Sequence, residues 1–123
     1  MIDTSAWVHQ MRSKGDAAVR ARVEDLLRAG EAAWCPMVRL EIWAGIADER
    51  ERRILREYEA VLPDLPIDDS VWRVACEIAG RARSGGKTIP ATDTLIYACA
   101  RAHGLEVEHA DGHFDLLAAL PTD

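Results

Sequence analysis

Amphipathic helical patterns alternate with very short extended stretches in this sequence, and this alternation most constrains its fold. Apolar residues recur at helical spacing over residues 16–29, 36–47, 48–62, 69–84 and 90–102. The candidate strands are residues 32–35 and 105–109. Helices separated by short strands favour a three-layer α/β/α domain with a small, mostly parallel sheet. Because no linker or repeat interrupts the chain, we expect a single domain over residues 1–123.

The predicted sheet brings two acidic residues to one edge. Residues 90–102 are the most apolar of the predicted helices, so we expect this helix to be central. Asp3 directly follows the first apolar residues of the chain, and Asp111 follows the last candidate strand. Ligands of parallel sheets bind outside the carboxyl ends of the strands. The two carboxylates are therefore the first indication of a functional site.

Four acidic residues lie beside apolar residues instead of among other charges: Asp3, Glu41, Asp93 and Asp111. A carboxylate near apolar surface is unfavourable unless it is paired or binds a metal. No Lys or Arg lies within three residues of Asp3 or Asp93, so local ion pairs are scarce. Converging carboxylates repel one another unless a divalent cation neutralises them, and oxygen ligands without thiols select Mg²⁺ or Mn²⁺.

Each of these acids also has an ordinary structural explanation. Asp93 could interact with the dipole of the helix that it begins, and Asp3 could cap the helix that it precedes. Asp111 could begin a turn with Gly112. Taken singly, these explanations are at least as good as a catalytic role, whereas the four positions together favour a shared site.

Other metal and disulfide sites are disfavoured. His109, Asp111 and His113 resemble a zinc-ligand cluster, but alternation along the strand places only the first two on one face, with His113 past the turn. The three cysteines are far apart without a CxxC pair, so we expect buried apolar side chains in a reducing compartment.

The N-terminal residues and the apolar runs predict where the protein acts. The first residues contain neither a basic nor an apolar signal region. No apolar run approaches the roughly 20 residues that a membrane span needs. We therefore expect a cytoplasmic protein with no membrane association.

Four segments are distinctive in their order and spacing: residues 1–7 (MIDTSAW), 40–45 (LEIWAG), 90–98 (PATDTLIYA) and 111–114 (DGHF). In this order they resemble the PIN-domain ribonucleases, especially the VapC-like toxins of bacterial toxin–antitoxin pairs. No single segment is very specific, but the ordered set spans nearly the whole chain. The resemblance implies the PIN-like α/β/α fold and a metal-dependent cleavage of RNA phosphodiesters.

The resemblance also assigns roles to individual residues. The catalytic positions would be Asp3, Ser5, Glu41, Asp93 and Asp111. Asp3, Asp93 and Asp111 would hold Mg²⁺ or Mn²⁺, and Glu41 would contact the metal through water or orient that water. Ser5 would hydrogen-bond a ligand acid or a phosphate oxygen. Asp115 is a candidate auxiliary acid.

The partners implied by the resemblance are an RNA substrate such as tRNA or rRNA, a VapB-like antitoxin and a second copy of the chain. Trp7 and Trp43 are candidates for an antitoxin groove near the first helices, although core packing is the favoured role for each. A catalytically inactive PIN-like module that binds RNA or protein is the alternative function. A hydrolase of small phosphate esters is weaker, because no DxDxT motif follows the first strand.

The net charge does not exclude an RNA partner. The chain has 15 Lys and Arg against 21 Asp and Glu, a formal charge of −6, which alone argues against nonspecific nucleic-acid binding. A bound cation, however, reverses the local effect of clustered acids. Arg12, Lys14 and Arg39 are candidate contacts for RNA phosphates.

Overall fold

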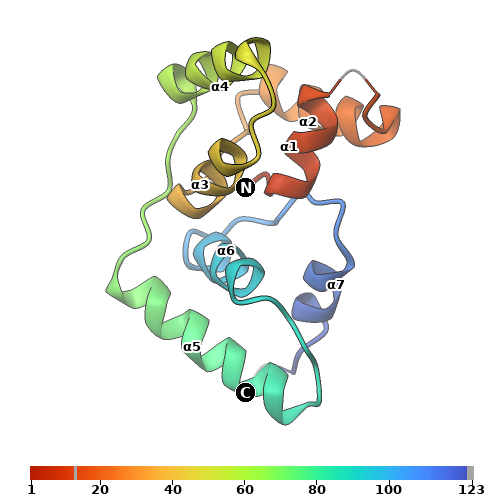
Figure 1. Ribbon diagram of the computed structural model, residues 1–123. Helices are drawn as coiled ribbons and strands as arrows, with labels where there is room; N and C mark the ends of the chain where they lie inside the picture. The colour runs from red at the N-terminus through yellow and green to blue at the C-terminus, as the bar shows by residue number, and fades with distance from the viewer. Residues whose placement is uncertain (13, 122–123) are drawn as a thin grey trace.

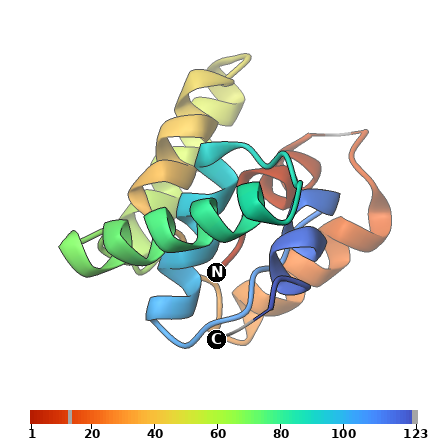
Figure 2. The same ribbon diagram turned by 90° about the horizontal axis from the view of Figure 1, so that it is seen from below.

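The computed structural model describes residues 1–12 and 14–121 of the chain. Its helices within these ranges are α1 (Thr4–Met11), α2 (Ala17–Arg28), α3 (Pro36–Ala44), α4 (Glu49–Val61), α5 (Asp69–Ser84), α6 (Ala91–Ala102) and α7 (Gly112–Ala118). Figure 1 shows α1–α4 in the upper part of the molecule and α5–α7 in the lower part. Helix α6 packs against α3, α5 and α7 and so joins the two parts. Its central position, seen again from below in Figure 2, confirms the prediction from its apolar sequence.

Aspartate side chains begin several of these helices. Asp16, Asp48 and Asp68 each accept hydrogen bonds from backbone N–H groups in the first turn of α2, α4 and α5. These bonds satisfy amide donors that have no partner inside the helix. The five predicted helices are thus confirmed with small shifts at their ends, whereas the short helix α7 was not predicted.

The predicted parallel sheet is not confirmed. In residues 1–12 and 14–121 no strand forms, and the candidate strands contribute isolated bridges. One parallel bridge joins Ile2 to Glu108, and a second joins Trp34 to Asp64. The N–H of Ile2 also donates to the carbonyl of Ala33 at 2.9 Å, which links the two pairs. The extended segments therefore lie side by side in the order that a small parallel sheet would have, without forming its ladders.

The sequence around the second bridge explains why pairing stops there. Pro63 and Pro66 flank Asp64, and proline has no N–H to donate to a ladder. Trp34 consequently pairs through two bonds, from its own N–H to the Pro63 carbonyl and from the N–H of Leu65 to its carbonyl. A three-layer description is therefore too regular for this chain, which is mostly helical.

An aromatic cluster fills the core between α1 and α4. The Trp7 ring lies 5.8 Å from that of Trp34 and 5.0 Å from that of Tyr58, measured between ring centroids. Trp7 is fully buried, which confirms the favoured prediction of core packing and excludes Trp7 from a partner groove. Trp43 is half-buried, and its indole N–H donates to the Glu59 carboxylate at 3.1 Å.

The cysteines and the helix lengths test two further predictions. Cys35 and Cys99 are buried as expected, but Cys76 is exposed on α5. Its exposure follows from its position on the outer face of an amphipathic helix whose buried face includes Ala75 and Ile78. Over the described parts of the chain, every helix is too short or too polar to span a bilayer.

Candidate active site

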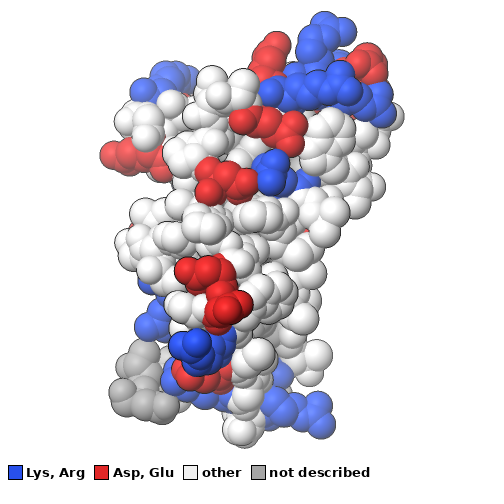
Figure 3. Space-filling view, turned by 90° about the vertical axis from the view of Figure 1, so that its left-hand side faces the viewer, with Lys and Arg blue, Asp and Glu red and all other residues white. Residues whose placement is uncertain are grey.

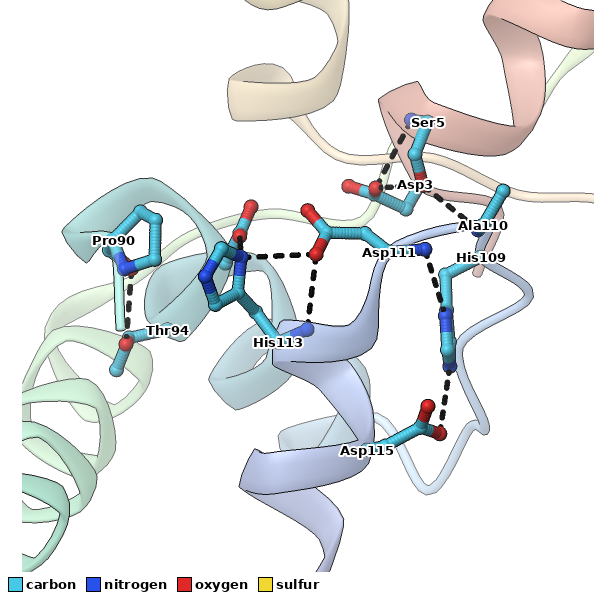
Figure 4. Close-up of polar contacts among 10 residues, drawn as sticks. Asp3, Ser5, Pro90, Thr94, His109, Ala110, Asp111, His113 and Asp115 are labelled. Carbon is cyan, nitrogen blue, oxygen red and sulfur yellow. Dashed lines mark hydrogen bonds and ion pairs between the residues drawn. The ribbon is translucent and has the colours of Figure 1, made fainter. Parts of the chain in front are cut away.

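The extended segments and three helix starts bring the predicted acids together. Asp3 follows the bridge residue Ile2 and begins α1, while Asp111 begins α7 shortly after the paired Glu108. Asp93 lies in the first turn of α6. Because the bridged segments run parallel, the residues that follow them lie at the same edge. Figure 4 shows Asp3 at the start of α1 and Asp111 at the start of α7, and the charges of both raise the pKa of Asp93.

Ser5 fixes the orientation of Asp3. The backbone N–H and the hydroxyl of Ser5 donate to Oδ2 of Asp3 at 3.0 and 2.7 Å. The Ser5 Oγ in turn accepts from the N–H of Ala110 at 2.9 Å, so it ties Asp3 to the segment just before Asp111. Asp3 is only 2% exposed. Its second oxygen, Oδ1, is buried without a hydrogen-bond partner among the described residues.

Glu41 reaches the same group of charges from α3. The Thr4 hydroxyl donates to its Oε1 at 2.8 Å. Burial raises the pKa of Glu41, and the negative charges of Asp3 and Asp111 raise it further, while the bond from Thr4 acts in the opposite direction. The Glu41 carboxylate is therefore close enough to Asp3 and Asp111 for their charges to change its pKa.

Asp93 is the most strongly perturbed of the four acids. Its pKa is raised to about 6, first by burial and then by the charges of Asp111 and Asp3. The nearby His113 acts in the opposite direction. Its surroundings thus disfavour the ionised carboxylate, and the positive charge of a bound cation would favour it.

His113 joins these acids, contrary to the prediction that it lies past the turn. Its Nδ1 is 2.9 Å from Oδ1 of Asp111 and 3.2 Å from Oδ2 of Asp93. The unpredicted helix α7 explains the error: Asp111 caps it by accepting the N–H of His113 at 2.9 Å, and this first turn brings the imidazole back. The Asp-Gly-His-Phe sequence contained this signal, because aspartate is a strong helix start.

His109 and Asp115 interact with each other and lie outside the cluster of acids. The Nδ1 of His109 accepts from the N–H of Asp111 at 3.3 Å, and its Nε2 is 3.6 Å from Oδ1 of Asp115. The His109 ring also stacks on Phe114, with 5.1 Å between centroids. The Asp115 side chain is 80% exposed and in Figure 4 lies away from Asp3. Its contact is thus with His109, not with the four acids.

The donor set fits a divalent cation. One ligand atom each of Asp93, Asp111 and His113 lies within 4.8 Å of the others. The unpartnered Oδ1 of Asp3 is a buried acceptor beside this group, and such atoms normally have a partner. Glu41 and Asp93, whose pKa values are both raised here, are stabilised by positive charge. The arrangement can therefore hold a cation and, around it, a phosphate group.

Basic residues border a narrow crevice beside Glu41. Arg12 lines this crevice of about 50 Å³ together with Glu41 and Glu51. Lys14 and Arg50 line an adjoining hollow of about 310 Å³. Figure 3 shows basic side chains gathered at the top of the molecule, over α4, mixed with acidic ones. Arg39, in contrast, contacts Glu59 at 3.3 Å and Asp64 at 2.8 Å, which leaves it engaged within the protein.

Comparisons with known proteins agree on one family. Residues 1–120 match the PIN domain. The chain is 37% identical to the VapC ribonuclease Mb1587 of Mycobacterium bovis, over 98% of this chain and 92% of that protein. FitAcB from Neisseria gonorrhoeae has a similar structure, with a TM-score of 0.73 and 22% identity over 97% of this chain and 92% of that chain.

A second solved structure also shares the fold. VapBC-5 from Mycobacterium tuberculosis, a member of the VapBC family of toxin–antitoxin systems, matches with a TM-score of 0.70 and 18% identity. The match covers 96% of this chain and 89% of that chain. The similarity therefore extends over essentially the whole length of both molecules.

Proposed function

The chain belongs to the PIN domain family, and from this premise we propose that it is a divalent-cation-dependent endoribonuclease that acts as the toxin of a toxin–antitoxin pair. Residues 1–123 would be a single nuclease domain. The observation that carries the proposal is the convergence of Asp3, Glu41, Asp93 and Asp111, in which Asp93 has a pKa of about 6. A helix-capping role alone requires no such convergence, because a cap needs only its own helix.

Asp3, Asp93 and Asp111 would hold the cation, with Mg²⁺ or Mn²⁺ suited to their oxygen atoms. When bound, the cation supplies the positive charge that polarises a scissile phosphate and activates water. Ser5 keeps Oδ2 of Asp3 occupied and so leaves Oδ1 for the cation.

Glu41 would orient and deprotonate the attacking water. Its raised pKa makes it a better proton acceptor than an exposed glutamate, and the Thr4 hydroxyl fixes the position of Oε1. The expected products carry a 5′-phosphate and a 3′-hydroxyl, because water attacks phosphorus and the 3′ oxygen leaves.

The substrate would be RNA, such as tRNA or rRNA, held by basic residues near the catalytic acids. Arg12 borders a crevice that Glu41 also lines, and Lys14 and Arg50 border the hollow next to this crevice, so all three can contact backbone phosphates. A formal charge of −6 predicts weak RNA binding without a divalent cation. We further propose a VapB-like antitoxin, in line with the VapBC toxin–antitoxin family of the similar structure VapBC-5, and a homodimer, which the resemblance to VapC-like toxins implies.

The test is cleavage of purified RNA by the purified chain with Mg²⁺, with Mn²⁺ and with EDTA. We expect cleavage in both metals and none in EDTA, with ligation-based mapping that finds 5′-phosphate ends. Cleavage that is equal in EDTA would refute the metal-dependent mechanism. RNA binding without cleavage in either metal would favour the alternative function, a catalytically inactive PIN-like module.

A further inference from the structure

We propose that His113 is a nitrogen ligand of the cation in this site, and that the site therefore prefers Mn²⁺ to Mg²⁺. The inference rests on the proposed function, because it concerns the same cation. It goes beyond the four acids, since an imidazole changes the ligand set from oxygen alone to oxygen and nitrogen.

The spacing around His113 matches that of ligands on one cation. Adjacent ligands of an octahedral ion at 2.0–2.1 Å lie about 3 Å apart. The Nδ1 of His113 is 2.9 Å from an oxygen of Asp111 and 3.2 Å from one of Asp93. Nδ1 thus has the separation of a neighbouring ligand from each carboxylate, and the three ligand atoms all lie within 4.8 Å of one another.

Two buried atoms beside this shell lack hydrogen bonds. The Nδ1 of His113 is buried without a partner in hydrogen-bond geometry, although both carboxylates are near it. The Oδ1 of Asp3, a residue 2% exposed, is likewise without a partner and lies on the side of Asp111 in Figure 4. Buried polar atoms normally find partners, so two of them at one place indicate a missing ligand.

The backbone holds the imidazole in this position. Asp111 accepts the N–H of His113 at 2.9 Å as the cap of α7, so the ligating oxygen and the imidazole belong to one turn. An imidazole held in this way loses little conformational freedom on binding a cation.

Ligand chemistry gives the predicted selectivity. Mg²⁺ favours oxygen ligands and loses its waters reluctantly, whereas imidazole nitrogen binds later divalent ions more readily. In the alternative reading, a protonated His113 is only a counter-charge for Asp93 and Asp111 and would have to leave when a cation binds. The two readings predict opposite effects of removing the imidazole on metal affinity.

Mn²⁺ binding by the full-length protein tests the inference. We expect pulsed EPR of the Mn²⁺ complex to show modulation from an imidazole nitrogen, and calorimetry to give tighter binding of Mn²⁺ than of Mg²⁺. His113→Ala should abolish the nitrogen signal and weaken Mn²⁺ binding about tenfold or more, with a smaller loss for Mg²⁺. His113→Asn, whose amide oxygen can occupy the place of Nδ1, should abolish the signal but keep more of the Mg²⁺ affinity.

His103→Asn is the matched control, because His103 lies at the opposite end of α6 from Asp93 and contacts the carbonyl of Pro66. It should retain the nitrogen signal and the affinities of the unchanged protein. An unchanged Mn²⁺ affinity in His113→Ala, or an absent nitrogen signal in a protein that binds Mn²⁺, would overturn the inference. If the unchanged protein cleaves RNA with metal but gives no nitrogen signal, only the role of His113 is refuted. If the unchanged protein neither binds metal nor cleaves RNA, the proposed function is refuted.

Discussion

Two aspartates near helix starts show opposite electrostatics. Asp16 caps α2 on the surface, where hydrogen bonds from Val19 and Ala18 lower its pKa. Asp93, in the first turn of α6, is buried among other acids, and its pKa is raised to about 6. The surroundings thus stabilise the charge of Asp16 and destabilise that of Asp93. A local pattern of acid and helix start therefore cannot distinguish a cap from a candidate metal ligand.

Asp3 and Asp111 combine both roles. Each caps a helix, α1 and α7, and each also lies beside other carboxylates. The structural and functional explanations of these acids are therefore compatible. What separates the two regions is burial: the oxygen that Asp3 has left over after capping is buried without a hydrogen-bond partner among the described residues, whereas Asp16 is exposed.

The largest expected effect is the loss of cleavage in Asp93→Asn. Removal of one carboxylate ligand should lower RNA cleavage about 100-fold or more, since even outer partners of metal ligands change activity 10–100-fold. The fold should be kept, because the amide has the same shape and relieves repulsion from Asp111 and Asp3. Initial rates in Mg²⁺ and thermal unfolding check the two parts. Unchanged cleavage would remove Asp93 from the site.

The second prediction concerns stability against pH without metal. The folded-state pKa of Asp93, about 6, lies above the model-peptide value of 3.8, so the folded state binds more protons between these values. This residue should therefore reduce the free energy of unfolding as the pH rises from 4 to 6, by about 2–3 kcal/mol, with no further change above.

Urea unfolding in EDTA at several pH values isolates this effect when the protein is compared with Asp93→Asn. The variant should gain stability relative to the unchanged protein up to about pH 6. Adding Mg²⁺ at pH 7 should restore stability to the unchanged protein more than to the variant. If the free energies of unfolding of the two proteins changed in parallel with pH in EDTA, the charge of Asp93 would not destabilise the folded protein.

The third prediction separates positioning from ligation. Thr4→Val removes the hydroxyl that donates to Glu41 and should lower cleavage about tenfold while metal affinity is largely kept. Without that bond the pKa of Glu41 should rise further, so the acidic limb of the pH–rate profile should move to higher pH. Thr4→Ser, which keeps the hydroxyl, should restore both the rate and the profile. An unshifted limb in Thr4→Val would contradict this role.

Much of the fold could be predicted because its helices are encoded locally. Apolar spacing predicts α2, α4 and α5 to within a residue or two, and in the structure an aspartate cap begins each of them. The sheet could not be predicted correctly, because pairing depends on partners far apart in sequence. Residues such as Trp34 and Glu108 find a partner for only a single bridge.

The site was predictable to the extent that its acids have unusual neighbours in sequence. The convergence of Asp3, Glu41, Asp93 and Asp111 was inferred from apolar surroundings, and their mutual electrostatic effects agree with it. His113 was misplaced because its position depends on the start of α7, which alternation along a strand conceals. The error came from one backbone turn, not from the chemistry of the residue.

The smallest expected effect concerns Asp68, a helix cap on the surface. Asp68 accepts the N–H of Val71 at 3.0 Å at the start of α5 and is exposed. Asp68→Ala should cost about 1 kcal/mol in the free energy of unfolding, because one amide donor loses its partner. Cleavage and metal affinity should remain unchanged, the reverse of the Asp93→Asn result. Urea unfolding beside initial rates would measure both, and a large loss of cleavage in a folded Asp68→Ala protein would show that capping alone cannot be separated from catalysis here.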